Sequence, residues 1–389
     1  MKRLHAAIAG IGFVGRAHLD ALRRLNIPVV GVLGSTPDKG RRFAEAFGIP
    51  RAYADFAEVV ADPIVDVVHV CTPNHLHFAM ASAAMHAGKH VVCEKPLALN
   101  ADESRELMRI RDSTGRVCAV CFNQRYYPLC HEARARIRSG QVGEIRMVHG
   151  EFLQDWLFSP TVWNWRLDPA IGGARRTVGD IGSHWLDLVE WITGLRVAEV
   201  CADLATFIPT RRRPASSAET FAEGATAPGA EEVAIPSEDY AAILLGFSGG
   251  ARGSVTLSQV CPGRKNRLRW EISGQKASMW WDAEDPNRLH IGHADAPNEA
   301  LIKSPVLMTA DARPYAAYPA GHAEGYPDTF ARLFQDVYAH IAAGHPYTSA
   351  PFPTVADGHR QVVLCEAIGE SARLRRWVAV ESTAEPAGP

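Results

Sequence analysis

Two residues in the middle of the chain have the types and the spacing of an acid–base pair. Asp180 and His184 lie four positions apart in the segment 179–184, which opens a predicted helix ending near Ile192. Residues four apart share one face of a helix, so the carboxylate and the imidazole would lie side by side. Such a pair suits general-base chemistry near neutral pH. The alternative is an Asp180 that caps the helix and a His184 that is satisfied within the core.

Three glycines near the start of the chain form the pattern GxGxxG. Gly10, Gly12 and Gly15 lie between a predicted strand and a predicted helix, the context that this pattern requires for a dinucleotide-binding turn. The first glycine permits the tight turn, the second lets the backbone approach a pyrophosphate, and the third lets the helix pack closely on the sheet. The helix N-terminus, with Phe13 and Val14, offers N–H groups to the phosphates. The pattern therefore predicts that the chain binds a nicotinamide dinucleotide, NAD(P).

The end of the second predicted strand indicates which dinucleotide fits. In NAD enzymes an Asp or Glu about twenty residues after the glycines holds the ribose hydroxyls. Here the strand ends in Gly34, Ser35 and Thr36, with Lys39 close behind, so the acid is missing. These residues leave room and donors for a 2′-phosphate, and we expect a preference for NADP.

Two further polar loops follow predicted strands and would lie at the same sheet edge. In a doubly wound sheet, loops at the carboxyl ends of the strands line the ligand crevice. Lys95 in the second loop is placed to polarise an oxygen beside the nicotinamide. The candidate cofactor-binding residues of these loops are Cys71, Thr72, Pro73, Asn74 and His77 in the first, and Glu94, Lys95 and Pro96 in the second.

The first 125 residues alternate short β-rich runs with amphipathic helical runs. This order predicts an α/β Rossmann domain, a doubly wound parallel sheet with helices on both faces. Thr36 is expected to cap the second helix, with Pro37 at its first position. The expected strands are 4–9, 29–33, 65–70, 90–93 and 116–122, and the expected helices are 14–25, 37–48, 75–87 and 102–112.

Residues 126–389 follow a different pattern, which predicts an α+β domain for substrate binding and oligomerisation. One more helix extends to Ser139, and the longer strands beyond it follow one another with few intervening helices, which favours a large open, mostly antiparallel sheet. We expect irregular structure over 283–319 and a flexible insertion at 209–236. The expected strands are 144–153, 197–208, 240–247, 251–260, 267–272 and 278–281, and the closing helices are 327–343 and 354–374.

Composition excludes several other classes of protein. The 389 residues are 47% hydrophobic and 22% charged, which is ordinary for a globular protein and too apolar for disorder. A formal net charge of −2 argues against nucleic acid as a partner. No apolar run approaches the roughly 18 to 20 residues of a membrane span. The 8 scattered cysteines and the lack of an export signal lead us to expect a cytoplasmic protein with reduced thiols.

Cysteine and histidine spacings do not indicate a metal site. Cys118 and Cys121 lie three apart on a predicted strand, so they face opposite sides of the sheet and are expected to be buried thiols. Two histidine pairs lack an acid or a cysteine at ligand spacing. These pairs are His75 with His77 and His290 with His293. We therefore expect no metal.

In this order, four motifs resemble those of the glucose–fructose oxidoreductase / inositol dehydrogenase superfamily. They are the glycine fingerprint, TPN-x-x-H at 72–77, EKP at 94–96 and D-x-G-x-H-x-x-D at 180–187. The resemblance covers nearly the whole chain, including the two-domain layout. It implies that Lys95, Asp180 and His184 are the catalytic residues and that the bond before Pro96 is cis.

Other segments resemble family residues near the substrate. Trp165 and Arg166 resemble a Trp-Arg pair that approaches both cofactor and substrate, whereas Trp163 is expected in the core. His322 and Tyr326 resemble residues at the mouth of the site. A polar lining that also includes Asn74, Asn164 and Asp187 suits a sugar or a cyclitol. The candidate substrate-binding residues are Lys95, Gln154, Asp155, Arg166, Asp180, His184, His322 and Tyr326.

The motifs and the resemblance together support one mechanistic hypothesis. His184 removes the proton of a secondary alcohol while hydride passes to the nicotinamide, and the reverse direction is ketone reduction. Lys95 stabilises the developing alkoxide, and Asp180 binds the substrate or orients the other two residues. Two alternatives are a redox-assisted glycosidase or lyase that holds its cofactor tightly, and a non-catalytic dinucleotide-binding sensor. The presence of all three residues disfavours the sensor.

Family architecture also implies a homo-oligomer, a dimer or a tetramer. The exposed face of the second-domain sheet would form its interface. Trp270, Trp280 and Trp281 are expected to supply an apolar patch there.

Overall fold

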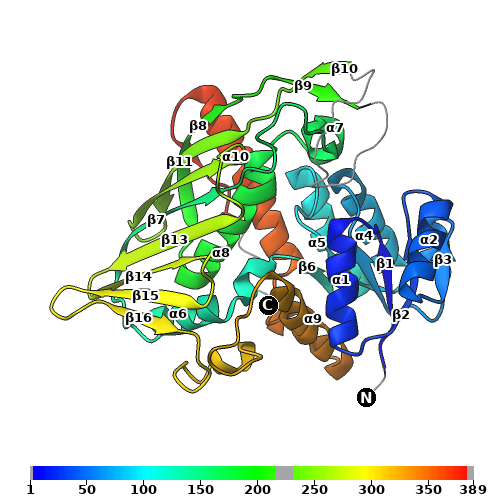
Figure 1. The fold of residues 1–389 in the computed structure, drawn as a ribbon, viewed down its shortest axis with the longest axis horizontal. Helices are drawn as coiled ribbons and strands as arrows, with labels where there is room; N and C mark the ends of the chain where they lie inside the picture. Colours follow the sequence, from blue (N-terminus) through cyan, green and yellow to red (C-terminus); the bar gives the residue numbers. More distant parts are fainter. Residues whose placement is uncertain (1–2, 215–230, 383–389) are drawn as a thin grey trace.

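Six parallel strands form the first sheet, in the order β3-β2-β1-β4-β5-β6 (Figure 1). The computed structural model describes residues 3–214 and 231–382. The strands are β1 (Ala6–Ala9), β2 (Val29–Leu33), β3 (Arg51–Tyr53), β4 (Val67–Val70), β5 (His90–Cys93) and β6 (Cys118–Val120). The helices between them are α1 (Phe13–Arg24), α2 (Pro37–Phe47), α3 (Phe56–Ala61), α4 (His77–His86) and α5 (Ala101–Thr114).

Helices cover both faces of this sheet. Leu22 of α1 and Phe43 of α2 pack into one hydrophobic core, which also receives Val337 of α9 (Tyr326–Ala343) from much later in the chain. Met85 of α4 and Leu107 of α5 pack into a second core on the opposite face. The predicted doubly wound Rossmann fold is therefore confirmed.

Nine strands form the second sheet, in the order β16-β15-β14-β13-β7-β12-β11-β8-β17. Neighbouring strands are antiparallel except β7 and β12, which run parallel. The predicted open, mostly antiparallel sheet is thus confirmed. Its strands are β7 (Ile145–Leu153), β8 (Val197–Ala205), β11 (Tyr240–Phe247), β12 (Arg252–Ser258), β13 (Arg267–Gly274), β14 (Ala277–Asp282), β15 (Arg288–His293), β16 (Glu299–Ile302) and β17 (Val378–Ala379).

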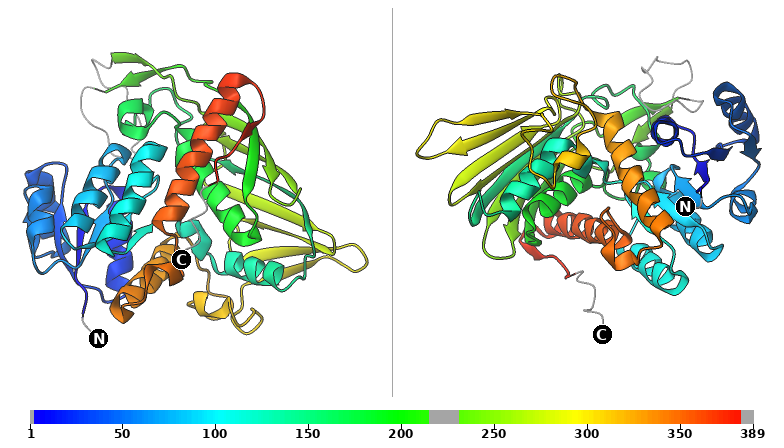
Figure 2. Two further views of the ribbon diagram at one scale, coloured as in Figure 1. Left: turned by 180° about the vertical axis from the view of Figure 1, so that it is seen from behind. Right: turned by 90° about the horizontal axis from the view of Figure 1, so that it is seen from below.

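Helices line one face of the large sheet and connect it to the first sheet. The helices α6 (Pro128–Arg138), α8 (Ser183–Thr193) and α10 (Val355–Leu374) contribute to the core against this face. Figure 2 shows, from behind and from below, that α10 lies between the two sheets. It contacts α5 and β6 on one side and β8 on the other. These helices therefore hold the edges of the two sheets in a fixed relation.

The expectation of irregular structure over 283–319 was wrong in part. This segment contains β15 and β16, which extend the sheet by antiparallel pairing with β14. The strands are short and carry His and Gly, so their composition is not typical of strands, and pairing along the edge of an existing sheet orders them. In the segment 209–236, β9 (Thr210–Arg213) and β10 (Glu231–Ala234) form a two-stranded ribbon. Residues 215–230 lie outside the described residues.

Two of the three tryptophans expected on the outer sheet face lie in the core. Trp270 and Trp281 are fully buried against the helices. Neighbouring residues of a strand point to opposite faces, so only Trp280 points outward, where it stacks on His290 with ring centroids 3.7 Å apart. The apolar patch of three tryptophans is therefore wrong.

Cys118 and Cys121 are free, buried thiols, as expected. Cys118 belongs to the core with α4 and α5, and Cys121 to the core with α1 and α9. The two thiols therefore lie on opposite faces of the first sheet. In the part of the chain that the structure describes, no helix combines the length and apolar character needed to span a membrane.

Candidate active site

Lys95, which follows a strand of the first sheet, and Asp180, which precedes α8, meet in an ion pair. Lys95 follows β5, and the bond between Lys95 and Pro96 is cis, as expected. Its Nζ donates to Asp180 Oδ1 and to the carbonyl oxygen of Asp180, both at 2.8 Å. Asp180 lies in a π-helical turn, Val178–Gly182, that precedes α8. The regular helix predicted from residue 179 thus begins only at Ser183, and Asp180 does not cap it.

The close packing of this turn explains one of its glycines. A Cβ at Gly182 would lie 2.6 Å from Leu257 Cδ1 on β12, so a larger residue there would require the end of the Leu257 side chain to move. Turns of this kind occur frequently at functional sites because they direct side chains away from the regular helical positions. In this chain the turn presents Asp180 to the loop after β5.

The carboxylate of Asp180 accepts hydrogen bonds from three side chains, the first of which is Lys95. Arg166 Nε donates to Oδ1 at 3.1 Å, and Gln259 Nε2 donates to Oδ2 at 2.8 Å. Burial alone would raise the pKa of Asp180, but the charges of Arg166 and Lys95 outweigh it and hold that pKa well below its usual range. Asp180 is therefore an ionised carboxylate that organises two cations.

His184 lies on the first turn of α8 and is 8% exposed. Burial and the charge of Lys95 lower its pKa to about 3. The ring packs edge-on against Phe122 with centroids 6.0 Å apart. Its Nδ1 is buried without a hydrogen-bond partner among the described residues. His184 is therefore neutral at ordinary pH, and only Nε2 remains accessible to accept a proton.

The glycine turn has the geometry of a dinucleotide cradle. Gly10 has a φ of +97°, and a Cβ there would lie 2.4 Å from the carbonyl oxygen of Cys71. A Cβ at Gly15 would lie 2.0 Å from the carbonyl oxygen of Gly10, whereas one at Gly12 would meet nothing within 4 Å. The helix begins at Phe13, and Gly12 gives it no side-chain cap. Open space at Gly12 beside a helix N-terminus fits a bound pyrophosphate.

The side chains of the loop after β4 brace the site. Asn74 Nδ2 donates to the carbonyl oxygen of Gly172 at 2.8 Å. The two ring nitrogens of His77 contact the carbonyl oxygens of Pro96 and Thr72, at 2.7 and 2.8 Å. Both side chains are buried; His77 ties the two candidate loops together, and Asn74 ties the first of them to Gly172.

The loop after β2 is exposed. Thr36 accepts a hydrogen bond from the backbone N–H of Lys39, so it caps α2 as predicted. Ser35 and Lys39 are exposed on the same turn. A Cβ at Gly34 would lie 2.6 Å from the backbone nitrogen of Gly40, so an acidic side chain cannot occupy position 34.

The residues expected around the substrate fall into two groups. Arg166 stacks over Trp165, with its guanidinium carbon 4.3 Å from the ring centroid, and reaches Asp180. Tyr326 stacks on Phe13 of the glycine turn with centroids 6.2 Å apart. The structure thus brings three candidates, Trp165, Arg166 and Tyr326, close to Asp180 or to the glycine turn.

The second group makes other contacts. Gln154 bonds Asn266, and Asp155 pairs with Lys265 at 2.6 Å in a neighbouring loop. His322 is exposed, and no hydrogen bond or ion pair joins it to Lys95 or Asp180 among the described residues. A further residue of the expected polar lining, Asp187, is instead buried in an ion pair with Arg125.

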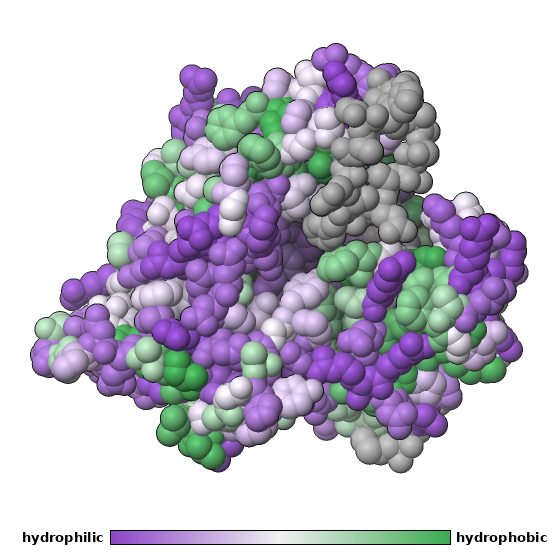
Figure 3. All heavy atoms as spheres, viewed as in Figure 1, coloured by the Kyte–Doolittle hydropathy of each residue, from purple (hydrophilic) through white to green (hydrophobic). Residues whose placement is uncertain are grey.

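Sequence reasoning missed Gln259. It follows β12, far from every motif, and its Oε1 accepts from the hydroxyl of Thr177 while its amide holds Asp180. A glutamine at a strand end has no spacing signal, so only the packing of β12 beside the π-helical turn identifies it. On the face drawn in Figure 3, hydrophilic residues gather along the left side of a hollow in the middle of the molecule.

Comparison with known proteins agrees with this geometry. Residues 4–122 match the family described as "Oxidoreductase family, NAD-binding Rossmann fold", and residues 130–280 match the "GFO/IDH/MocA C-terminal domain". The chain is 31% identical to levoglucosan dehydrogenase of Pseudarthrobacter phenanthrenivorans, over 98% of this chain and 99% of that one.

Solved structures give the same result. A levoglucosan dehydrogenase in complex with NADH and L-sorbose has a TM-score of 0.87 at 28% identity, covering 98% of this chain and 100% of that chain. An inositol dehydrogenase homolog complexed with NAD+ from Azotobacter vinelandii has a TM-score of 0.84 at 29% identity, with 97% of each chain covered. The chain therefore belongs to the glucose–fructose oxidoreductase / inositol dehydrogenase (GFO/IDH/MocA) family of oxidoreductases with an NAD-binding Rossmann fold.

Proposed function

We propose that this chain is an NAD(P)-dependent dehydrogenase or reductase that acts on a secondary alcohol or ketone of a sugar, a sugar derivative or a cyclitol. The observation that carries the proposal is the convergence of Lys95 and Arg166 on Asp180, at the sheet edge where the glycine turn lies. A bound nicotinamide supplies the acceptor or donor of hydride.

Lys95 has one donor left for the substrate. An ammonium group has three N–H donors, and two of them are used by the carboxylate and the carbonyl of Asp180. The third is free to donate to the oxygen of the reacting carbon, where negative charge develops. A fixed cation at that position lowers the barrier, because its orientation is set before the reaction begins.

His184 receives the hydroxyl proton at Nε2 in the oxidative direction and returns it in the reductive direction. Nδ1 is buried without a hydrogen-bond partner among the described residues, so the proposed role requires the neutral tautomer whose lone pair is on Nε2. A pKa of about 3 favours release of the proton to the substrate oxygen in the reductive direction and makes the ring a weaker acceptor in the oxidative direction.

The names of relatives narrow the substrate class. Solved levoglucosan dehydrogenases carry levoglucosan or L-sorbose, and an inositol dehydrogenase homolog carries myo-inositol. A partial relative is named 1,5-anhydro-D-fructose reductase. We infer a cyclic polyol as substrate, because Trp165 offers an aromatic ring beside the polar groups of Arg166 and Asp180.

A panel of these four compounds tests the function. Purified protein is mixed with each compound and NAD(P) or NAD(P)H, and the absorbance of the reduced nicotinamide is followed. Turnover of at least one cyclic polyol supports the proposal. Absence of binding of either dinucleotide would overturn it. Nucleotide released on denaturation in stoichiometric amount, without net turnover, would favour the glycosidase or lyase alternative.

The choice between NAD and NADP stays a prediction. The exposed Ser35 and Lys39, and the lack of space for an acid at Gly34, support NADP. The solved relatives with NADH or NAD+ support NAD. Competitive titration of the emptied protein with both dinucleotides decides between them.

We also propose that the dinucleotide-binding domain comprises residues 1–125 and the second domain residues 126–389. We further propose that the chain forms a homo-oligomer through the outer face of the large sheet. Met147 and Leu244 are exposed on strands of this sheet, and Trp280 points the same way. Light scattering after gel filtration would measure the assembly. A monomer at micromolar concentration would contradict it.

A further inference from the structure

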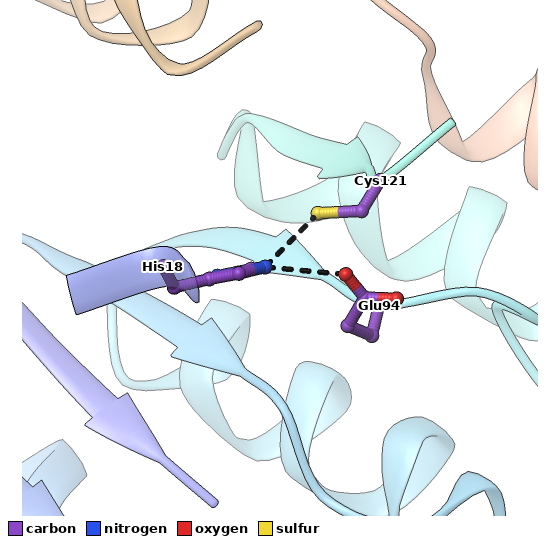
Figure 4. A group of neighbouring side chains, drawn as sticks. All are labelled: His18, Glu94 and Cys121. Carbon is purple, nitrogen blue, oxygen red and sulfur yellow. Dashed lines mark hydrogen bonds and ion pairs between the residues drawn. The ribbon is translucent and has the colours of Figure 1, made fainter. Parts of the chain in front are cut away.

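Three side chains from separate elements meet in the core of the first domain (Figure 4). His18 comes from α1, Glu94 follows β5, and Cys121 follows β6. His18 Nε2 lies 3.2 Å from Glu94 Oε1 and 3.7 Å from Cys121 Sγ. One ligand atom from each residue lies within 4.8 Å of the other two. All three residues are buried, and none belongs to the hydride-transfer group described above.

Their donor atoms form a set that zinc prefers. Zinc is bound in proteins by imidazole nitrogen, thiolate sulfur and carboxylate oxygen, in tetrahedral geometry. With bond lengths of about 2.0 to 2.3 Å, neighbouring ligand atoms of a tetrahedron lie roughly 3.3 to 3.6 Å apart. The two distances at His18 Nε2 are close to this range, so little movement would be needed to close the ligands around an ion.

The groups behind these ligands are arranged to orient them. His18 Nδ1 lies 2.9 Å from His69 Nδ1, and His69 Nε2 lies 2.9 Å from the hydroxyl of Tyr338. A ligating histidine usually donates its second ring N–H to such a partner, which fixes its tautomer and orientation. Glu94 Oε2 accepts from the backbone N–H of Lys95 at 3.2 Å, which leaves Oε1 for the ion.

A cation would also compensate the buried charge. Glu94 is buried, and its Oε1 lies 3.2 Å from His18 Nε2. Cys121 is a free, buried thiol beside them. On binding, the S–H bond breaks, a sulfur–metal bond forms and the proton leaves to solvent.

We propose that His18, Glu94 and Cys121 bind a thiophilic divalent cation of the zinc type. Three protein ligands leave a fourth position open in tetrahedral geometry. Sequence spacing did not indicate this site, because Glu94 and Cys121 lie 76 and 103 residues after His18. The site uses no residue of the proposed hydride-transfer step and shares Glu94 with the loop expected to bind the cofactor. It adjoins the catalytic lysine through the backbone of Glu94 and Lys95.

Metal titration of the whole chain tests this site. The protein is stripped with a chelator and titrated with Co²⁺, then with Zn²⁺ in competition. We expect one cobalt per chain, a thiolate-to-cobalt charge-transfer band, the visible bands of tetrahedral cobalt, and displacement by zinc. X-ray absorption of the zinc-loaded wild type should show one sulfur ligand, with nitrogen and oxygen in the other positions. A protein that retains no metal after desalting, or a zinc site without sulfur, would overturn the proposal.

Two matched cysteine variants locate the site. Cys121→Ser should weaken cobalt binding by more than about 100-fold, beyond the 10- to 100-fold typical of losing an outer partner, and should abolish the charge-transfer band. Cys118→Ser removes an equally buried thiol from the opposite face of the same sheet. This variant should leave the cobalt affinity and the charge-transfer band unchanged. Equal losses in the two variants would contradict the assignment. The absorption spectrum of the wild type decides the question if Cys121→Ser does not fold.

Discussion

Lys95 Nζ donates to both the side-chain oxygen and the backbone carbonyl of Asp180, each at 2.8 Å. The lysine follows a strand of the first sheet, and the aspartate lies in a π-helical turn packed against the second. Two bonds to one residue fix the direction of the ammonium group as well as its position. The third N–H of Lys95 is therefore aimed by the docking of the two sheets.

Replacement of Lys95 should lower turnover far more than cofactor binding. Lys95→Met removes the donor to the developing alkoxide, so we expect kcat to fall by about 10²- to 10³-fold. The Kd of the dinucleotide should change little, because the glycine turn supplies its main contacts. Steady-state kinetics and fluorescence titration measure the two quantities. Lys276→Met, at an exposed lysine far from the site, is the control. A loss confined to cofactor affinity would contradict the proposed role.

The low pKa of His184 predicts how rate and stability depend on pH. The ring stays neutral in the folded protein down to about pH 3, so kcat/KM should not fall between pH 7 and pH 5 through protonation of His184. In the unfolded chain the imidazole titrates near 6.5. The unfolded state therefore binds the extra proton first, and stability is lost as the pH falls below about 6.5, by about 1.4 kcal/mol per pH unit at most.

His184→Asn should remove this contribution. Urea unfolding of the wild type and the variant at pH 7 and pH 5 measures it as a difference in slope. The same variant should lower kcat by about 10²- to 10⁴-fold. Identical pH slopes in the two proteins would show that His184 titrates normally in the folded state.

Gln259 should act as a positioning residue for Asp180. Gln259→Leu leaves Oδ2 of a buried carboxylate without its donor, so we expect kcat to fall about 10-fold through loss of one hydrogen bond to a charged group. Gln259→Glu places a second carboxylate beside Asp180, which should raise the pKa of Asp180 and shift the acid limb of the rate profile upward. An unshifted profile would limit Gln259 to a structural role.

Alanine at two glycines should separate folding from cofactor binding. A Cβ at Gly12 meets no atom of the protein within 4 Å, so Gly12→Ala should keep the Tm of the free protein and weaken dinucleotide binding. A Cβ at Gly15 would lie 2.0 Å from a carbonyl oxygen, so Gly15→Ala should destabilise the fold by about 3 kcal/mol or more. Calorimetry measures the stability of each variant, and cofactor titration measures its dinucleotide affinity. Unchanged dinucleotide affinity in Gly12→Ala would contradict the proposal that the pyrophosphate binds at this turn.

An acid at Ser35 should change the preference between the two dinucleotides. Position 34 has no room for a side chain, so Ser35 is the first position after β2 that can carry one. Ser35→Asp should lower NADP affinity relative to NAD by at least about 10-fold through repulsion of the 2′-phosphate. Titration of wild type and variant with both dinucleotides tests this, and an unchanged ratio would place the ribose elsewhere.

Local patterns in the sequence determined much of this protein. Hydrophobic periodicity and turn residues predicted five of the six strands of the first sheet, all but β3, and the capping of α2 by Thr36 follows from its type and position. Alternation along a strand predicts that Cys118 and Cys121 face opposite sides, as they do. The motif residues Lys95, Asp180 and His184 are identifiable for the same reason, since each lies in a short run whose meaning depends on neighbours in the chain.

Only the tertiary structure decided which distant residues meet. Gln259 reaches Asp180, and His18 reaches Glu94 and Cys121, although each pair is separated by 76 or more positions in the sequence. Trp281 turns inward while Trp280 turns outward because β14 pairs in one register and not in the other. Such contacts arise from the packing of whole sheets and helices. The type of a single residue at a strand end or within a helix does not indicate which distant residue it will contact. The contacts of Gln259 and of His18 could therefore not be predicted from the sequence.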